Sequence, residues 1–173
     1  RADLQAEASR LGFTTLRVAT LERPTPGIDA YDAWLQAGHH GEMAYLADGR
    51  DDRADATRRL PSARSVLVLA VDHAHSVPPD PGGRTGRVAR YAWGRDYHNL
   101  IGKRLRKLRR WLRGRGVANW GGVDTAAILE RSWARRAGLG YLGKNTLAIV
   151  PGRGSWFFLA VLFVDAALEP DPP

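Results

Sequence analysis

Cysteine is absent from the 173-residue chain. Without a thiolate, the chain forms no disulfide, has no Cys ligand for zinc or an iron–sulfur cluster, and has no Cys nucleophile. Long apolar runs are also absent, since none approaches the roughly 20 residues of a membrane span. The first residues, RADLQAEASRLGF, lack the basic-then-apolar order of a signal peptide. These absences predict a soluble, cytoplasmic protein with no membrane partner.

The length and composition fit a single domain. At 173 residues, 44% of them hydrophobic, the chain can bury one sizeable core but hardly two. It starts at Arg1 rather than Met and ends in EPDPP, a composition typical of a linker. We therefore expect a monomeric fragment of a longer protein, with one domain over residues 1–168 and the start of a linker over 169–173.

Acidic residues are scarce in one stretch of the chain. Between Arg84 and Val123 there are twelve Lys or Arg residues and a single acid, Asp96. Within this stretch, residues 103–115 carry leucines at helical spacing, which predicts an amphipathic helix with a cationic outer face. Such a surface attracts phosphates, so we expect nucleic acid or another polyanion as the partner. An ordinary solvated helix face is the alternative interpretation.

Helices and strands alternate along the chain without internal repeats. Helical periodicity and glycine stops predict helices at 2–11, 28–37, 41–48, from 96 onward and at 125–137. Apolar, β-branched runs predict strands at 13–19, 65–73, 117–120 and on both sides of a turn within 145–165. Residues 76–86, rich in Pro and Gly, predict a loop. The pattern predicts a mixed α/β (α+β) fold in which a single sheet is flanked by helices.

The segment GLGYLGKN, residues 138–145, matches two nucleotide-binding patterns. Its glycines give the GxGxxG of a dinucleotide-binding turn, and its GxxxxGK is a P-loop without the final Ser or Thr. A dinucleotide turn or a P-loop requires a strand before the glycines and a helix after them. Here the order is reversed, because the glycines follow the predicted helix at 125–137 and precede NTLAIV. We therefore reject both patterns and expect Gly138 to end that helix in a left-handed conformation.

Five motifs, taken in order, resemble the epoxyqueuosine reductases, the cobalamin-dependent enzymes that complete queuosine in transfer RNA. The motifs are GEMAYL, LPSARSVLVLA, GRVARYAWGRDYHNLI, VDTAAILERSWARRAGLGYLGKNTLAI and GSWFFLA, and they cover essentially the whole chain. The resemblance implies that residues 1–168 are a cobalamin-binding catalytic domain on a nitroreductase-like scaffold. It also implies a following ferredoxin-like domain with two four-iron, four-sulfur clusters. The chain stops before the family's cysteine motifs, so the resemblance implies that this fragment alone is inactive.

The resemblance also implies a reaction, the reduction of the epoxide of epoxyqueuosine to an alkene with two electrons, two protons and loss of water. In the family low-valent cobalt is the reducing centre, and an Asp that matches Asp124 protonates the departing oxygen. A carboxyl group does this at neutral pH if burial raises its pKa, and we expect the apolar side chains at 120, 123, 126 and 127 to bury it. The alternative is that Asp124 is the N-cap of the helix at 125–137.

Six further residues match family positions expected near the corrin: Arg53, Tyr91, His98, Lys144, Asn145 and Ser155. The amide side chains and phosphate of cobalamin need hydrogen-bond donors, which several of these residues supply. The alternatives are a surface ion pair for Arg53 and, for the aromatic residues, a core edge beside an Asp96 helix cap. We interpret Glu130 and Arg131 as a structural pair. We assign no metal ligand, and no axial ligand of cobalt.

Three functions follow from these observations. The first is the cobalamin-binding domain of a reductase that acts on the transfer RNA anticodon stem-loop and docks it on the basic helix 103–115. The second is a non-catalytic, basic RNA-binding module, although the sequence has no RNP motif. The third is a flavin-dependent, nitroreductase-like enzyme. The sequence does not identify an electron donor.

Overall fold

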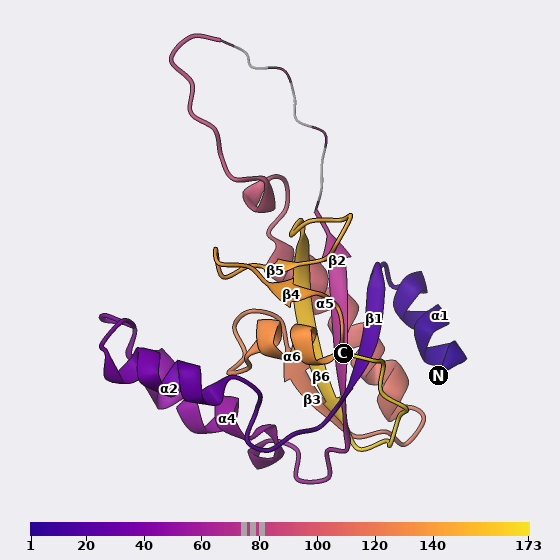
Figure 1. Cartoon of the computed structure of the whole chain (residues 1–173). Helices are drawn as coiled ribbons and strands as arrows, with labels where there is room; N and C mark the ends of the chain where they lie inside the picture. The colour runs from indigo at the N-terminus through magenta and orange to yellow at the C-terminus, as the bar shows by residue number, and fades with distance from the viewer. Residues whose placement is uncertain (74–75, 77–78, 80–81) are drawn as a thin grey trace.

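The chain folds around a four-stranded antiparallel sheet in the order β1-β2-β6-β3 (Figure 1). The structure, a computed structural model, describes residues 1–73, 76, 79 and 82–173. The strands are β1 (Thr15–Thr20), β2 (Ser65–Asp72), β3 (Asn119–Gly122) and β6 (Phe157–Val164). β2 and β6 form the centre of the sheet, and β1 and β3 are its edges.

Both faces of the central strand β2 are buried. Side chains alternate across a strand, so Leu67 and Leu69 lie in the core on one face, and Val66 and Val68 lie in the core on the other. All four are fully buried. A continuous apolar, β-branched run is what a strand covered on both sides requires, and this explains why the sequence predicted β2 well.

Helices cover the two faces. α1 (Ala2–Arg10) and α5 (Tyr97–Arg113) pack on the Leu67 face, and α6 (Glu130–Arg136) packs on the Val66 face. Trp133 of α6 is buried with its ring edge-on to Phe163, at a centroid distance of 5.6 Å. The predicted mixed fold, a sheet flanked by helices, is confirmed. A small second sheet, the hairpin of β4 (Tyr141–Leu142) and β5 (Ala148–Ile149), adds to it.

The remaining helices lie beside the sheet. α2, α3 and α4 form an arm that extends from one side of the sheet (Figure 1). Their bounds, with those of the two 3-10 turns, are α2 (Ile28–Gln36), α3 (Ala44–Asp48), α4 (Arg50–Ala54), η1 (Ala56–Arg58) and η2 (Arg90–Ala92). No helix in the described part of the chain has the length and hydropathy of a membrane span. The loop predicted at 76–86 lies partly outside the described residues.

The helix predicted at 125–137 begins only at Glu130. Asp124 adopts a left-handed conformation with φ +55°, and short backbone contacts such as Thr125 N–H to Val123 O, at 2.6 Å, turn the chain. Ile128 is buried in the core on the α6 side of the sheet, so tertiary packing overrides the helical preference of these residues. The N-cap of α6 is Leu129, and the interpretation of Asp124 as a helix cap is therefore wrong.

Gly138 and Gly140 of GLGYLGKN lie between α6 and β4, and Gly143 lies in the turn between β4 and β5, so the predicted order of helix before strand is confirmed. Gly138 has φ +66°, as a helix-ending glycine requires. A Cβ on this residue would lie 2.0 Å from the carbonyl oxygen of Pro172, which packs against it. Nearby, Val18 N–H donates to the Asp171 carboxylate at 2.8 Å. Residues 171–172 thus lie along the outer edge of β1.

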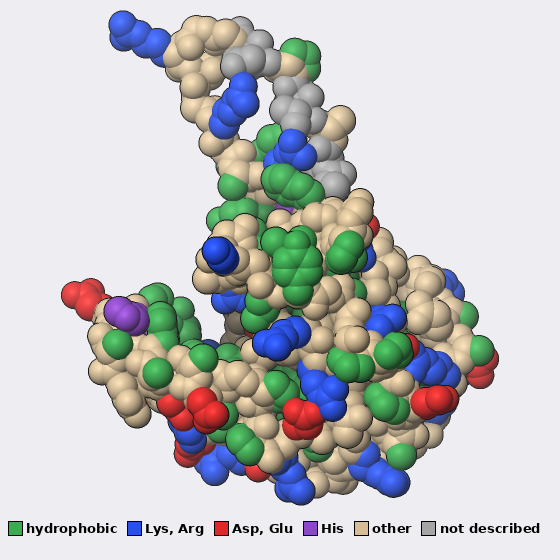
Figure 2. Space-filling model, in the orientation of Figure 1, with side chains coloured by type: hydrophobic (Ala, Val, Ile, Leu, Met, Phe, Trp, Pro, Cys, Tyr) green, Lys and Arg blue, Asp and Glu red, His purple; other side chains and the backbone are tan. Residues whose placement is uncertain are grey.

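Exposed hydrophobic side chains gather near the β4–β5 hairpin. Tyr141, Leu142 and Leu147 of this hairpin and Trp156 just before β6 are each at least 40% exposed. Figure 2 shows hydrophobic side chains on the surface at the position of this hairpin. Such a patch on a small domain commonly marks a binding surface.

Candidate active site

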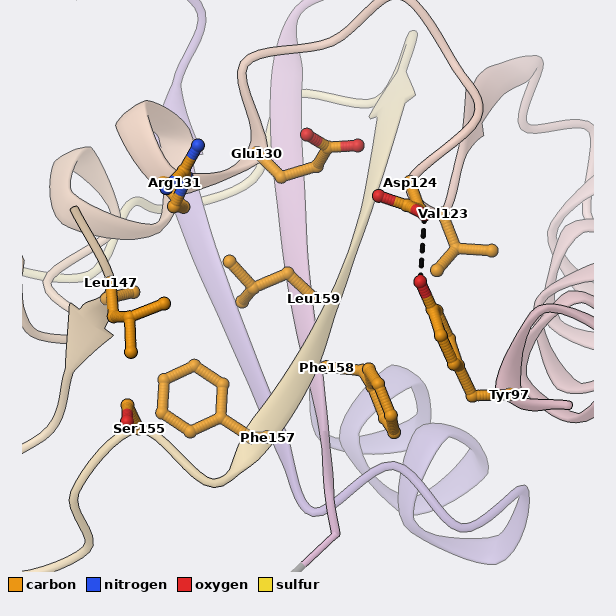
Figure 3. A pocket seen from close by; sticks show the side chains of 11 residues that line it. Tyr97, Val123, Asp124, Glu130, Arg131, Leu147, Ser155, Phe157, Phe158 and Leu159 are labelled. Atoms are coloured by element: carbon orange, nitrogen blue, oxygen red, sulfur yellow. Dashed lines mark hydrogen bonds between the residues drawn. The ribbon is translucent and has the colours of Figure 1, made fainter. Parts of the chain in front are cut away.

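A cavity of about 290 Å³ opens where the N-terminal ends of β6, α5 and α6 meet (Figure 3). Its apolar wall comes mainly from β6 and the hairpin, and its polar groups come from α5, α6 and the segment after β3. The apolar lining residues are Val123, Leu147, Ala148, Phe157, Phe158 and Leu159, and the polar ones are Tyr97, Asp124, Glu130, Arg131 and Ser155. An apolar pocket with a few convergent polar groups is the usual form of an active site.

Asp124 has two hydrogen-bond partners, both from the first turn of α5. Tyr97 Oη donates to Asp124 Oδ2 at 2.8 Å, and His98 Nε2 lies 2.7 Å from the same oxygen. Asp124 Oδ1 has no partner among the described residues and remains available to a ligand. The left-handed backbone of Asp124 turns the carboxyl group toward α5, which is a strained arrangement of the kind found at functional sites.

Asp124 is not enclosed as the sequence predicted, because its side chain is 58% exposed. Of the apolar neighbours expected to bury it, only Val123 lines the cavity. The expectation assumed that a helix starts directly after Asp124. In the structure Ala126 packs against the core on the α6 side of the sheet, and hydrogen bonds from Tyr97 and His98 to the Asp124 carboxyl group take the place of apolar shielding.

His98 lies between two carboxylates. Its Nδ1 is 2.8 Å from Asp96 Oδ1, and its Nε2 faces Asp124. The hydrogen bond with Asp124, followed by that with Asp96, raises the pKa of His98. Only the imidazolium form has an N–H for both acceptors, so His98 can hold a proton next to Asp124. Asp96 also accepts from His98 N–H at 2.9 Å, and the predicted cap of α5 is confirmed.

Tyr97 connects Asp124 to the aromatic wall of the cavity. Its ring stacks on Phe158 at a centroid distance of 4.1 Å and an angle of 12°. Burial, and then the hydrogen bond to Asp124, raises the pKa of Tyr97. Tyr97 therefore keeps its proton and serves as a fixed hydrogen-bond donor that orients Asp124.

Glu130 is a second carboxyl group in the same cavity. Its Oε1 is buried and has no hydrogen-bond partner among the described residues. Burial raises the pKa of Glu130 to about 7, and the negative charge of Asp124 adds to the rise. The hydrogen bond from the backbone N–H of Glu130, followed by the positive charges of Arg53 and Arg131, opposes it. Arg131 instead donates to the carbonyl oxygen of Thr146. The interpretation of Glu130 and Arg131 as a structural pair is therefore wrong.

Because the pKa of Glu130 is raised in the folded chain, its contribution to the free energy of unfolding decreases as the pH rises. The folded chain keeps a proton on Glu130 between the ordinary value of 4.5 and about 7, where the unfolded chain has lost it. We expect the unfolding free energy of Glu130→Gln, relative to wild type, to rise by about 2–3 kcal/mol across this range of pH. Urea unfolding at several pH values measures this difference. Glu42→Gln, at an exposed position, is the control. If the unfolding free energy relative to wild type were independent of pH for Glu130→Gln as well as for Glu42→Gln, Glu130 would not be a buried ionisable group.

Arg53 lies in α4 behind the cavity and is only 9% exposed. Its guanidinium is 5.6 Å from the centroid of the Tyr31 ring and 3.4 Å from the carbonyl oxygen of Leu46. No described carboxylate forms an ion pair with it, so the alternative of a surface ion pair is wrong. Its charge acts on Glu130.

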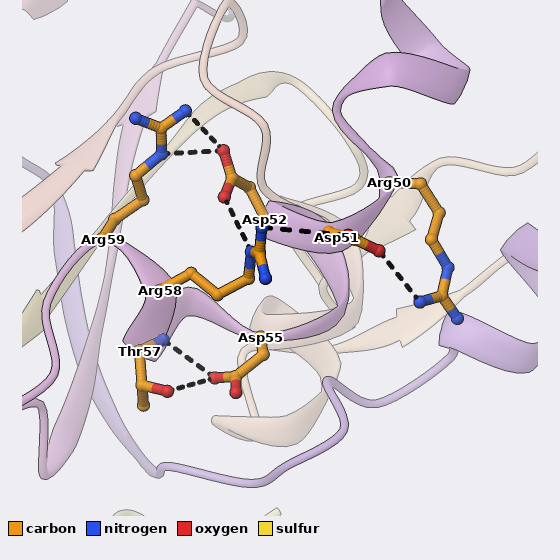
Figure 4. Close-up of polar contacts among 7 residues, drawn as sticks. All are labelled: Arg50, Asp51, Asp52, Asp55, Thr57, Arg58 and Arg59. Carbon is orange, nitrogen blue, oxygen red and sulfur yellow. Dashed lines mark hydrogen bonds and ion pairs between the residues drawn. The ribbon is translucent and has the colours of Figure 1, made fainter.

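Polar contacts on the outer side of α4 hold this helix in place (Figure 4). Asp52 pairs with Arg59 at 2.6 Å and with Arg58 at 3.5 Å. Asp55 then caps η1 by accepting from Thr57 N–H at 2.9 Å. These contacts tie α4 to the turn that follows it, and they fix the segment from which Arg53 reaches inward.

Of the other residues predicted near the cofactor, Ser155 lines the cavity. Tyr91 lies beside it, with its ring edge-on to Tyr97 at a centroid distance of 6.3 Å. Lys144 and Asn145 are exposed in the β4–β5 hairpin and do not line the cavity, and the side-chain Oδ1 of Asn145 accepts from Leu147 N–H at 3.2 Å.

The sequence analysis did not identify Glu130 as a candidate site residue, because it predicted a continuous helix over residues 125–137. In a continuous helix, positions 124 and 130 would lie about 120° apart around the helix axis, since six residues turn the chain by about 600°. The irregular segment at 125–129 instead brings Glu130 back to Asp124. The described residues contain no group of three His, Asp or Glu side chains that could hold a metal ion.

Comparisons with known proteins identify similar sequences. The family model "Epoxyqueuosine reductase QueG, DUF1730" matches residues 53–125. An epoxyqueuosine reductase of Synechococcus sp. (strain CC9605) is 37% identical over 175 residues, which cover 98% of this chain and 53% of the relative. The chain thus spans about half the length of the curated relatives that it matches.

Solved structures share the fold. A crystal structure of epoxyqueuosine reductase with an epoxyqueuosine-modified tRNA-Tyr stem loop aligns with a TM-score of 0.82 and 25% identity, over 99% of this chain and 47% of that one. A reductive dehalogenase whose structure suggests a mechanism for B12-dependent dehalogenation aligns with a TM-score of 0.65 and 21% identity, over 99% of this chain and 20% of that one. Together with the sequence matches, this shows that the chain belongs to the epoxyqueuosine reductase family.

Proposed function

We propose that this chain is the cobalamin-binding catalytic part of an epoxyqueuosine reductase, an oxidoreductase that converts epoxyqueuosine to queuosine in the anticodon of transfer RNA. The observation that carries this proposal is the cavity in which Asp124, with Tyr97 and His98 behind it, faces an apolar wall. Removal of the epoxide oxygen needs a positioned proton donor. The family relationship supplies the substrate class.

The residues around the cavity fit the chemistry of a corrin. A corrin is a broad, mostly apolar macrocycle with amide arms and a phosphate, so it needs an apolar surface with hydrogen-bond donors at its rim. Leu147, Phe157 and the exposed Trp156 supply the apolar surface. Ser155, Lys144 and Asn145 would bind the arms, with Tyr91 and His98 on the opposite side. Arg53 would act from behind through Glu130. Reduced cobalamin, when bound, supplies the electrons for cleavage of the carbon–oxygen bond.

Asp124 would give its proton to the substrate from Oδ1, the oxygen without a protein partner. Oδ2 stays bonded to Tyr97, which fixes the direction of the carboxyl group. The imidazolium form of His98 can offset the negative charge that Asp124 acquires when Oδ1 gives up its proton, because Nε2 is 2.7 Å from Oδ2. Tyr97 and His98 therefore orient the donor and stabilise the carboxylate that it leaves behind.

The transfer RNA would contact α5, whose first turn borders the cavity. Lys103, Arg106 and Lys107 are exposed close to that end of the helix. Arg104 and Arg109 contribute less, since Arg104 donates to the carbonyl oxygen of Gly12 and Arg109 donates to Asn119. An anticodon base placed in the cavity would bring the phosphates beside it to this turn of the helix.

The remaining length of the relatives would supply electrons through two four-iron, four-sulfur clusters, with residues 169–173 leading to that part. The 173 residues hold no cysteine, so cysteine-ligated clusters cannot lie within them. Residues 1–168 would then be the cofactor-binding domain.

Binding of the cofactor tests the proposed function. We expect the purified chain, mixed with cob(II)alamin and freed of excess ligand, to retain the cofactor with a changed visible spectrum. Aquocobalamin is too oxidised to be the working form, so the mixture is kept anaerobic. Retention of a flavin in place of cobalamin would favour the nitroreductase-like alternative. Binding of the stem-loop RNA with no cofactor at all would favour the non-catalytic RNA-binding module.

A further inference from the structure

We propose that Glu130 is the second proton donor of the reaction and delivers its proton to the oxygen that Asp124 protonates first. This inference rests on the proposed function and assigns a role to a residue that the family motifs left as structural. It follows from where Glu130 lies and from what its carboxyl group contacts.

The geometry favours a proton donor over a structural role. Glu130 is the first residue of α6, and it lines the same cavity as Asp124. Figure 3 shows its carboxyl group extending toward Asp124, whereas Arg131 lies on the other side. Its buried Oε1 has no partner among the described residues. A structural carboxyl group in the interior is normally hydrogen-bonded, so an unpaired carboxyl oxygen on a residue that lines a cavity is unusual and calls for a functional explanation.

The balance of the reaction requires two protons at one place. Both carbon–oxygen bonds of the epoxide break, a carbon–carbon double bond forms, and the oxygen leaves as water. The cofactor, recharged by a low-potential reductant, supplies two electrons, and the oxygen takes up two protons. Asp124 gives the first proton as the carbon–oxygen bond breaks, and Glu130 gives the second to the resulting hydroxyl group. Solvent then reprotonates both carboxyl groups.

The neighbouring groups are less suited to the second proton transfer. The pKa of Tyr97 is raised, so it does not release its proton at neutral pH. His98 reaches the cavity only through Asp124. Glu130, in contrast, has a pKa raised to about 7, so that near neutral pH it both holds a proton and can release it. The hydrogen bond from the backbone N–H of Glu130, and then the positive charges of Arg53 and Arg131, keep this pKa from rising further.

The experiment compares Glu130→Gln with wild type, with both chains loaded with cobalamin and reduced by titanium(III) citrate. The substrate is a stem-loop RNA that carries epoxyqueuosine, and Glu42→Gln is the matched control. We expect Glu130→Gln to lower turnover by roughly 10²-fold, the lower end of what general acids contribute, because the hydroxyl group leaves poorly without the second proton. Glu130→Asp, which retains a carboxyl group, should recover part of the loss.

Two further readouts separate a proton donor from a structural residue. Wild-type turnover should fall as the pH rises through about 7, and Glu130→Gln should lose this limb of the profile. The carboxyl carbon of Glu130, followed by NMR in the chain without cofactor, should titrate near the same pH. Unchanged turnover and an unchanged pH profile in Glu130→Gln would overturn the inference alone. Absence of cobalamin binding or of turnover in wild type would overturn the proposed function, and the inference with it.

Discussion

We expect Asp124→Asn to lower turnover by about 10²–10⁴-fold while the affinity for cob(II)alamin stays that of the wild type. Asparagine has nearly the same size and keeps an acceptor for Tyr97, but it carries no acidic proton. The loss should therefore appear in the chemical step and not in the binding of RNA or cofactor. Single-turnover reduction of an epoxyqueuosine stem-loop by the cobalamin-loaded chain measures this step.

Asp165→Asn is the matched control for this substitution. Asp165 follows the end of β6 that is remote from the cavity, and its backbone N–H donates to the carbonyl oxygen of Ala118 at 3.2 Å, which the substitution leaves intact. The control should keep wild-type turnover. If Asp124→Asn also kept it, Asp124 would be a residue that positions His98, and another group would have to protonate the departing oxygen.

The second large effect is expected at Gly121, in the edge strand that leads to Asp124. Its φ of +152° disfavours other residues, and a Cβ would lie 2.0 Å from the carbonyl oxygen of Val161 on β6. Gly121→Ala must push β3 away from β6, and we expect it to lower the free energy of unfolding by about 2–5 kcal/mol. Denaturant unfolding monitored by tryptophan fluorescence measures the loss.

Gly102→Ala provides a comparison of opposite sign. Gly102 lies within α5, where a Cβ would meet only the tip of Arg106, at 3.9 Å. Alanine is the better helix former, so this variant should gain about 0.5–1 kcal/mol. A Gly121→Ala variant as stable as wild type would mean that β3 shifts freely along β6, and that Asp124 is not held by the pairing of these strands.

The sheet and its two cores were predictable because burial leaves a periodic signal. The run from Val66 to Val71 is apolar at every position, and Leu105 and Leu108 recur at helical spacing on α5. Each pattern indicates which residues of one helix or strand are buried, and it can be recognised from the local sequence alone. The cap of α5 by Asp96 was predicted for the same reason.

The arrangement of the candidate site was less predictable, because it depends on segments that meet only in three dimensions. The sequence drew attention to Asp124, but Tyr97 and His98 reach it across 27 and 26 positions of the chain. Glu130 was misread because the five residues before it look helical and are not. The pairing of charges was also misassigned, since Arg131 donates to the carbonyl oxygen of Thr146 and forms no ion pair with Glu130 among the described residues. Local propensity carries no information on such contacts.

The placement of Asp124 after an edge strand has a consequence for how the site moves. β2 and β6 can separate from their neighbouring strands only if the hydrophobic cores on both faces of the sheet are disrupted. β3, in contrast, is paired along one side and has only four residues. Opening of β3 and of residues 123–129 therefore costs less free energy than global unfolding. Asp124 can leave the cavity in such a local fluctuation while Glu130, at the start of α6, stays in place. A substrate that binds against Asp124 would oppose this local opening. It would thereby stabilise β3, the least stable strand of the sheet.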